Sequence, residues 1–241
     1  MTYSREERQS RSAMLLTNQQ LDLLWRSHVM VFGLGGVGSY AAEALCRAGV
    51  GRLTLIDADT VAVSNLNRQL PALCSTVGKP KAQVVRERLL DIAPDAQIEA
   101  IQAFYLPEER VEIPNDTDFV VDAIDTVAAK LDLAVLCHER GIPLIACMGM
   151  GNRLDPTKLR IGDLFDTTDC PLCRVMRREL RRRKVNALRC VYSEEPAIKP
   201  HVVDAAQGRL PGSMVYVPAV AGMYVAHEVV SRICGSAQTE V

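Results

Sequence analysis

The sequence predicts an α/β fold with a doubly wound, mainly parallel sheet and helices on both of its faces. Between residues 28 and 147, short apolar runs alternate with helical patterns, which is typical of parallel strands joined by crossover helices. A glycine-rich turn at residues 33–38 follows the first apolar run and opens an alanine-rich helical pattern. Asp57 ends the second apolar run about 20 residues further on, as in a dinucleotide-binding fold. The expected architecture is therefore Rossmann-like.

Each element of this alternation has a local justification. Thr17 and Asn18 precede a leucine-rich segment, so a capped helix is expected to lead into the first strand. Lys79 and Pro80 open a helix that Pro94 stops. The expected strands are 28–32, 52–56, 97–101, 119–121 and 143–147, and the expected helices are 37–48, 79–92 and 126–140.

The alternation loosens beyond residue 151. There we expect a short strand at 158–161, a basic helix at 171–184, a strand at 188–192, a mobile loop at 196–212 and a closing helix at 217–234. The closing helix would pack on the sheet or across a dimer interface. We interpret residues 1–241 as one domain, with a nucleotide-binding core at 1–155 and a basic, loop-rich extension at 156–241 that binds the substrate.

Composition excludes several classes of protein. With 48% hydrophobic and 24% charged residues, the chain can bury a core and is not disordered. The apolar stretch 214–233 is interrupted by Pro218, His227, Glu228 and Arg232, so we expect a buried helix and no membrane span. Eight scattered cysteines without a signal peptide indicate reduced thiols in the cytoplasm.

Polar residues at the predicted strand ends indicate a nucleotide site. The glycines at 33, 35 and 38 let backbone N–H groups approach phosphates at a helix N-terminus, where the helix dipole attracts negative charge. The Asp57 carboxylate can accept hydrogen bonds from ribose hydroxyls. A dehydrogenase does not need the polar cluster Asn65-Leu66-Asn67-Arg68-Gln69 just beyond this acid. That cluster suits a protein that holds a triphosphate and works on it.

Three charged residues extend this site to ATP chemistry. Arg68 supplies a planar fork and Lys81 a point charge for a polyphosphate. Asp125 follows the fourth strand, at the ligand-binding edge of an open sheet, where a carboxylate can hold Mg²⁺ against phosphates. The alternative role of Asp125 is to cap the helix that follows.

The nucleotide-site residues belong to five motifs that occur in a definite order. They are Gly33-x-Gly35-Gly36-x-Gly38, Asp57-x-Asp59, Asn65-x-Asn67-Arg68-Gln69, Gly78-Lys79-Pro80-Lys81 and Asp122-x-x-Asp125. Over most of residues 8–155, this set resembles the ubiquitin-activating-enzyme superfamily. Its bacterial members adenylate carboxylates on sulfur-carrier proteins for thiamine and molybdopterin synthesis.

The resemblance implies a role for individual residues. Arg68 and Lys81 would bind phosphates, and Asp125 would bind magnesium. The resemblance also implies a homodimer in which an arginine near the N-terminus reaches the partner's site. Arg11 holds that place here, with Arg8 as a second candidate and a solvated surface charge as the alternative. The residues implied for ATP binding are Gly33, Gly35, Gly36, Gly38, Asp57, Asp59, Asn65, Asn67, Arg68, Gln69 and Lys81.

Cysteine spacing bears on the choice of substrate. Sulfur-carrier activating enzymes of this superfamily usually hold a structural zinc with two Cys-x-x-Cys pairs, and this chain has one, Cys170 and Cys173. Tetrahedral zinc needs four ligands. Cys190 and His201 could complete a site, but their spacing is atypical. We therefore expect no zinc and interpret the cysteines as thiols.

The segments 122–127 and 149–157, together with 163–181 and 191–196, resemble the tRNA threonylcarbamoyladenosine dehydratase branch of the superfamily. This extends the resemblance over nearly the whole chain. It implies ATP-dependent adenylation of the threonyl carboxylate of N6-threonylcarbamoyladenosine beside the anticodon, followed by cyclisation with loss of water. The alternative is adenylation of the C-terminus of a ubiquitin-like sulfur carrier, and a non-catalytic or NAD-binding protein is a third hypothesis. A monovalent cation and a sulfur-transfer partner stay open.

A basic run fits a tRNA partner. Residues 174–189 contain seven Arg and one Lys against one Glu. At helical spacing, the first four arginines share one face and would bind phosphates in a salt-dependent way. The alternative is a solvated basic helix. The expected tRNA-binding residues are Arg174, Arg177, Arg178, Arg181, Arg182, Arg183 and Lys184.

Overall fold

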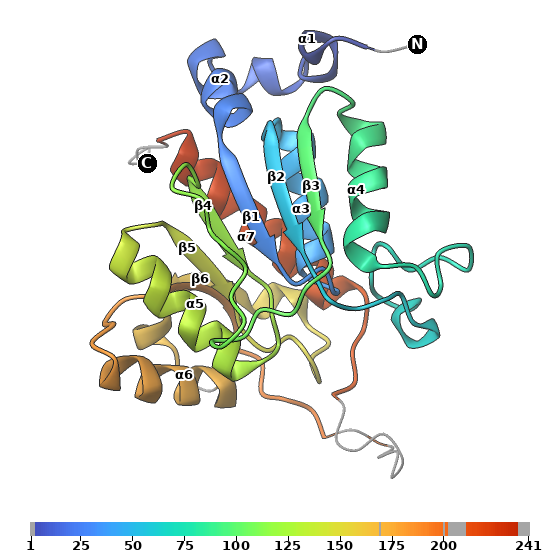
Figure 1. The fold of residues 1–241 in the computed structure, drawn as a ribbon. Coiled ribbons are helices and arrows are strands. Elements are labelled where there is room, and N and C mark those ends of the chain that lie inside the picture. The colour runs from blue at the N-terminus through green and yellow to red at the C-terminus, as the bar shows by residue number, and fades with distance from the viewer. Residues whose placement is uncertain (1–2, 169, 200, 202–210, 236–241) are drawn as a thin grey trace.

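The computed structural model describes residues 3–168, 170–199, 201 and 211–235, and these form one seven-stranded sheet (Figure 1). Neighbouring strands are parallel except for the last pair, and the strand order reverses between β1 and β4. The predicted doubly wound, mainly parallel sheet is confirmed. In spatial order the strands are β3 (Gln97–Ile101), β2 (Arg52–Ile56), β1 (His28–Phe32), β4 (Phe119–Asp122), β5 (Leu144–Cys147), β7 (Arg189–Ser193) and β6 (Leu159–Asp163).

Helices cover both faces of the sheet, as predicted (Figure 1). One face carries α3 (Gly38–Ala48), α4 (Lys81–Ile92) and α7 (Tyr216–Ile233), and the other carries α5 (Val127–Arg140) and α6 (Pro171–Arg182). Two short helices, α1 (Arg5–Arg8) and α2 (Asn18–Arg26), precede β1. Among the described residues, no helix is long and apolar enough to cross a membrane.

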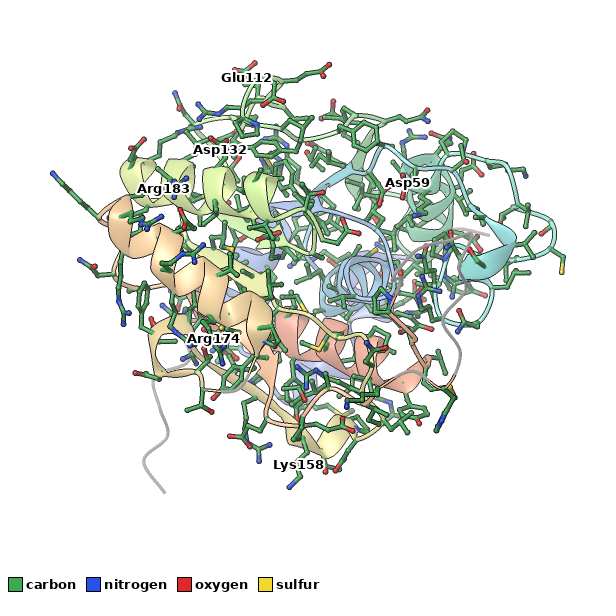
Figure 2. The ribbon with its side chains drawn as sticks, turned by 90° about the horizontal axis from the view of Figure 1, so that it is seen from below. Asp59, Glu112, Asp132, Lys158, Arg174 and Arg183 are labelled. Atoms are coloured by element: carbon green, nitrogen blue, oxygen red, sulfur yellow. The ribbon has the colours of Figure 1, made fainter. Side chains whose placement is uncertain are left out.

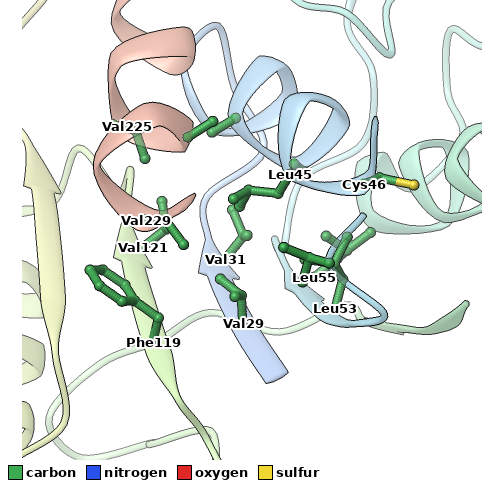
Figure 3. Close-up of a cluster of buried hydrophobic side chains, with 14 of the residues drawn as sticks. Val29, Val31, Leu45, Cys46, Leu53, Leu55, Phe119, Val121, Val225 and Val229 are labelled. Atoms are coloured by element: carbon green, nitrogen blue, oxygen red, sulfur yellow. The ribbon is translucent and has the colours of Figure 1, made fainter. Parts of the chain in front are cut away.

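Alternate residues of each strand enter different cores, because successive side chains of a strand point to opposite faces. Val31 packs with Leu45 of α3 and Val229 of α7 (Figure 3). Its neighbour Phe32 packs with Leu133 of α5 on the opposite face. Burial of each such side chain contributes roughly 1.5–3 kcal/mol. The two cores hold the carboxyl ends of β1, β2 and β4 in fixed positions.

The closing helix α7 packs against α3 and begins beside the glycine turn. A Cβ at Gly222 would lie 2.6 Å from the carbonyl oxygen of Val37, so glycine is required for the two helices to approach this closely. Near the start of α7, the Cβ of Pro218 lies 3.2 Å from where a Cβ of Gly36 would stand. The N-terminal end of α7 therefore lies beside the glycine turn, next to the N-terminal end of α3.

The strands predicted over 28–32, 52–56 and 97–101 occur with the predicted bounds, and the other predicted boundaries shift by no more than two residues. The helix predicted over 79–92 begins at Lys81, because Pro80 has an extended ψ of 129° and caps it. The helix predicted over 171–184 ends at Arg182, because Lys184 adopts a left-handed φ of 62°. The strand predicted over 158–161 runs from Leu159 to Asp163 and is antiparallel to β7. Residues 200 and 202–210 of the predicted loop 196–212 lie outside the described residues.

His28 opens β1 in a buried position. It is 2% exposed, and its Nε2 lies 2.9 Å from the Thr54 hydroxyl. Burial lowers the pKa of His28 from 6.5, so the unfolded chain binds the proton more readily. We expect the free energy of unfolding to decrease as pH falls below about 6.5, and to decrease less in His28→Gln. Urea denaturation at several pH values measures this. The exposed His138→Gln variant should follow the wild type, and equal slopes in all three proteins would refute the assignment.

Candidate nucleotide-binding site

The glycine turn joins β1 to α3 at the edge of the sheet where the strand order reverses. Gly33 has a φ of 87°, and a Cβ there would lie 2.7 Å from the carbonyl oxygen of Ala123 in the β4–α5 connection. A Cβ at Gly38 would lie 1.8 Å from the carbonyl oxygen of Gly33. Val37 gives α3 no side-chain cap. The N–H of Ser39 donates to the carbonyl oxygen of Gly35 at 3.3 Å, and the start of α3 directs the positive end of the helix dipole toward the turn, so the turn fits a phosphate.

Asp57 fixes the glycine turn from the end of β2. Its Oδ2 accepts a 2.6 Å hydrogen bond from the N–H of Leu34, and its Oδ1 accepts one of 2.8 Å from the N–H of Asp59. Burial raises the pKa of Asp57, while the Leu34 hydrogen bond and the nearby charge of Lys81 oppose that rise. The carboxylate lies where a ribose bound over the turn would meet it.

Lys81 begins α4, and the fold pairs it with Asp59. The lysine is 5% exposed, and its Nζ lies 2.8 Å from Asp59 Oδ2. The backbone N–H of Lys81 also donates to the carbonyl oxygen of Asp59, at 2.9 Å. The carboxylate therefore holds the ammonium group at the end of β2, beside the glycine turn.

Arg68 and Gln69 lie against the glycine turn, as the motif order predicts. The Cγ of Arg68 is 3.7 Å from the position of a Cβ on Gly36, and the Nε2 of Gln69 is 3.7 Å from that of a Cβ on Gly35. Arg68 is partly buried, so its stem packs on the turn while the guanidinium stays near the surface.

Asn65 and Asn67 organise the loop that carries Arg68. Asn65 is buried, and its carbonyl oxygen accepts from the N–H of Arg68 at 3.1 Å. Asn67 Oδ1 accepts from Arg68 Nη1 at 2.9 Å, and Asn67 Nδ2 donates to the carbonyl oxygen of Ser213, also at 2.9 Å. Both asparagines thus position Arg68, and Asn67 ties the loop to the segment before α7.

Asp125 presents a free carboxylate at the same edge. The N-cap of α5 is Thr126, and no side chain caps this helix, so the alternative role of Asp125 as a helix cap is wrong. Asp125 is exposed, and no hydrogen bond or ion pair joins its carboxylate to any described residue. An oxygen ligand of this kind suits Mg²⁺, which keeps several waters and binds phosphate oxygens. Asp125 therefore fits the predicted role of a magnesium ligand.

A buried ion pair that sequence patterns did not indicate lies beneath Asp125. Lys130 of α5 and Asp122 at the end of β4 are both fully buried, and Lys130 Nζ lies 3.0 Å from Asp122 Oδ2. Asp122 Oδ1 accepts a 3.1 Å hydrogen bond from the N–H of Ile124. Burial raises the pKa of Asp122, and the charge of Lys130 opposes this. The available signal was a lysine between the apolar Ala129 and Leu131.

Arg11 lies at the other end of α3 from the glycine turn. Gln9, two residues earlier, packs against Gly49 and donates to the carbonyl oxygen of Arg47, at the C-terminus of α3. A helix of 11 residues spans roughly 16 Å. Arg11 is exposed and does not join the site of its own chain. Its role across a dimer stays a prediction.

Several of the arginines expected to bind tRNA make contacts within the chain. Arg177 is half-buried and donates to the carbonyl oxygen of Thr167 at 2.6 Å, and Arg181 lies over the Phe165 ring. Glu179 accepts from Arg178, Arg182 and Arg183. Figure 2 shows Arg174 and Arg183 at the two ends of α6, on the opposite side of the molecule from Asp59. Contact of this helix with tRNA stays a prediction.

The cysteine pair lies at the start of α6, away from the glycine turn. Cys170 is the N-cap residue of this helix, and both thiols are buried. Hydrogen bonds from Cys173 and from N–H groups of the first turn lower the pKa of Cys170. In the described part of the chain, no group of three or more His, Cys, Asp or Glu side chains is arranged to hold a metal ion.

A comparison with protein families classifies this arrangement. The ThiF family model matches residues 7–241. The chain belongs to the ThiF family. Within it, the chain is 39% identical over 234 residues to tRNA threonylcarbamoyladenosine dehydratase of Bacillus subtilis, covering 92% of each protein. The crystal structure of the Escherichia coli dehydratase TcdA in complex with ATP matches with a TM-score of 0.86 and 32% identity, covering 100% of both chains.

Other ThiF-type relatives match less of the chain. The molybdopterin-synthase adenylyltransferase of Escherichia coli is 39% identical over 120 residues, which is 50% of this chain and 48% of that protein. The sulfur carrier protein ThiS adenylyltransferase of the same organism is 36% identical over 63% of this chain. The likeness to these enzymes thus leaves much of the chain unmatched.

Proposed function

We propose that this ThiF-family protein is an ATP-dependent tRNA threonylcarbamoyladenosine dehydratase. The observation that carries the proposal is the likeness to a dehydratase over 92% of both proteins, whereas the sulfur-carrier adenylyltransferases match 50% and 63% of the chain. The ATP-bound TcdA structure shares the fold over its full length. The alternative substrate, the C-terminus of a sulfur carrier, therefore has weaker support.

The chemistry required is activation of a carboxylate. A free carboxylate is a poor electrophile, because it cannot expel oxide or hydroxide. An oxygen of the threonyl carboxylate attacks the α-phosphorus of ATP, and pyrophosphate leaves. The neighbouring urea group then attacks the activated carbonyl carbon, loses a proton and releases AMP. The five-membered closure benefits from high effective concentration, so positioning and charge neutralisation are the main tasks of the enzyme.

The residues gathered at the carboxyl ends of β1, β2 and β4 can perform these tasks. The N–H groups at the start of α3 receive phosphate oxygens. Arg68 and Lys81 neutralise the charge that develops on the leaving pyrophosphate, with Asp59 and Asn67 keeping the two cations in place. Asp125 would hold Mg²⁺, which supplies further charge stabilisation when bound.

A second copy of the chain would complete the site. Arg11 is remote from the glycine turn of its own chain, so we propose that it reaches the phosphates bound by the partner in a homodimer. We place the protein in the cytoplasm, where its eight free thiols stay reduced and tRNA is present.

A direct assay tests this function. The protein is incubated with ATP, Mg²⁺ and tRNA that carries threonylcarbamoyladenosine, and the digested nucleosides are analysed by mass spectrometry. We expect the modified nucleoside to lose one water, with AMP and pyrophosphate formed in equal amounts. Pyrophosphate release that depends on a sulfur-carrier protein, with no change in the nucleoside, would replace this function with the alternative.

The exposed arginines of α6 are expected to bind tRNA phosphates. Replacing Arg178 and Arg182 with alanine should weaken tRNA binding by about tenfold. The slope of log binding constant against log salt concentration should become shallower by about one to two, since each phosphate contact contributes roughly one unit of slope. ATP binding should not change. Filter binding at several salt concentrations measures both quantities. The control changes Arg26 and Arg47, near the amino ends of the strands, and an equal loss there would show a non-specific charge effect.

A further inference from the structure

The segment that carries Asp125 is supported on two sides. On one side, the N–H of Ala123 donates to the carbonyl oxygen of Phe32 at 2.8 Å, and the Ala123 carbonyl lies against Gly33. On the other side, the Asp122 side chain folds back onto the segment and accepts the N–H of Ile124, the residue before Asp125. The orientation of the Asp122 carboxylate therefore determines where the segment leaves β4.

Lys130 is the residue that orients this carboxylate. Its Nζ lies 3.0 Å from Asp122 Oδ2 and 3.5 Å from the Asp122 carbonyl oxygen, so one ammonium group contacts both the side chain and the backbone of the same residue. Lys130 is 0% exposed, so water does not compete for these contacts. The backbone N–H of Lys130 also donates to the carbonyl oxygen of Thr126, at 3.1 Å, across the first turn of α5. Thr126 directly follows Asp125.

We infer that the buried Lys130–Asp122 ion pair is a positioning device that holds Asp125 where it binds the magnesium ion of MgATP. Lys130 touches neither nucleotide nor metal and acts through Asp122 and the residues that follow it. The inference rests on the proposed function of the site and assigns a role to a residue that sequence patterns did not indicate. Substitution of a residue that orients a metal ligand without touching the metal typically lowers metal affinity by about 10–100-fold.

The test compares wild type with Lys130→Met and with the double variant Lys130→Met/Asp122→Asn. The single variant leaves a buried carboxylate without its partner and is expected to lower Tm. The double variant removes both charges, while the amide oxygen introduced by Asp122→Asn can still accept from Ile124. It should therefore recover most of the thermal stability. ATP binding is measured by titration at increasing Mg²⁺ concentrations, without tRNA, and Tm by calorimetry.

We expect the Mg²⁺ concentration for half-maximal enhancement of ATP binding to rise about tenfold or more in the double variant, with ATP affinity in EDTA unchanged. Recovery of both Tm and the wild-type Mg²⁺ requirement would mean that the pair only balances charge, and would overturn the inference. A wild-type protein whose ATP binding does not respond to Mg²⁺ would overturn it too. The nucleoside assay described above measures the reaction independently of Mg²⁺-dependent ATP binding, so it can still confirm or contradict the proposed function.

Discussion

Asp125→Ala is expected to lower kcat by about 10²–10³-fold, the loss seen when one electrostatic contact to a reacting group is removed. Asp125 is exposed and has no partner among the described residues, so its removal should leave the fold intact. Tm should therefore stay within about 1 °C of wild type, because surface substitutions of this kind change stability little. Activity is measured by the nucleoside assay at saturating ATP and stability by calorimetry.

The matched control for this change is Asp91→Ala, an exposed carboxylate near the end of α4, far from the glycine turn. It should keep full activity. If Asp125→Ala retained wild-type kcat across Mg²⁺ concentrations, the magnesium assignment would be removed, whatever the outcome for the reaction itself.

Gly38→Ala should weaken ATP binding strongly. An alanine Cβ would stand 1.8 Å from the Gly33 carbonyl oxygen and 3.1 Å from the Ala123 Cβ, so the turn between β1 and α3 must open. The N–H groups that approach the phosphates would then be displaced. We expect ATP affinity to fall by at least about 100-fold, equal to two hydrogen bonds to a charged group, with a lower Tm. Isothermal titration with ATP and calorimetry measure the two effects.

Gly149→Ala is the matched control for the turn. Gly149 follows β5 at the carboxyl ends of the strands, but a Cβ there would meet no atom of the described residues within 4 Å. This variant should bind ATP as the wild type does. Near-normal ATP affinity in Gly38→Ala would show that the phosphates are bound elsewhere, and would contradict the assignment of the glycine turn as the phosphate site.

Most of the fold, and the gathering of the candidate site residues at one edge of the sheet, could be predicted because they depend on local order. Carboxyl ends of parallel strands meet at one edge, so residues after β1, β2 and β4 had to gather there. Arg68 lies in the loop that follows β2, and Lys81 begins the helix that follows this loop, so both were expected at this edge. The alternative role of Asp125 as a helix cap is wrong because Thr126, one residue later, is the N-cap residue of α5. Which residue caps a helix depends on where the helix begins to within one residue, and the helix propensities of the residues do not fix this position so closely.

The arginine-rich helix illustrates the opposite case. Spacing alone placed Arg177 with its neighbours on one face, but the packing of α6 turns its guanidinium toward Thr167, and Glu179 binds three others. Charge runs do not reveal which members the fold engages. Their contact partners come from segments that only the folded chain brings near.

The order of residues along the chain was enough to specify the α/β class, the glycine turn and the chemistry of a nucleotide site, because periodicity and backbone freedom are properties of neighbouring residues. Which charges are paired emerged only from the folded chain. Lys81 meets Asp59 across 22 positions, and Asn67 meets Ser213 across 146. Lys130 became a buried partner of Asp122 only when α5 packed on the sheet. Burial sets the strength of such pairs, and burial depends on how distant elements pack.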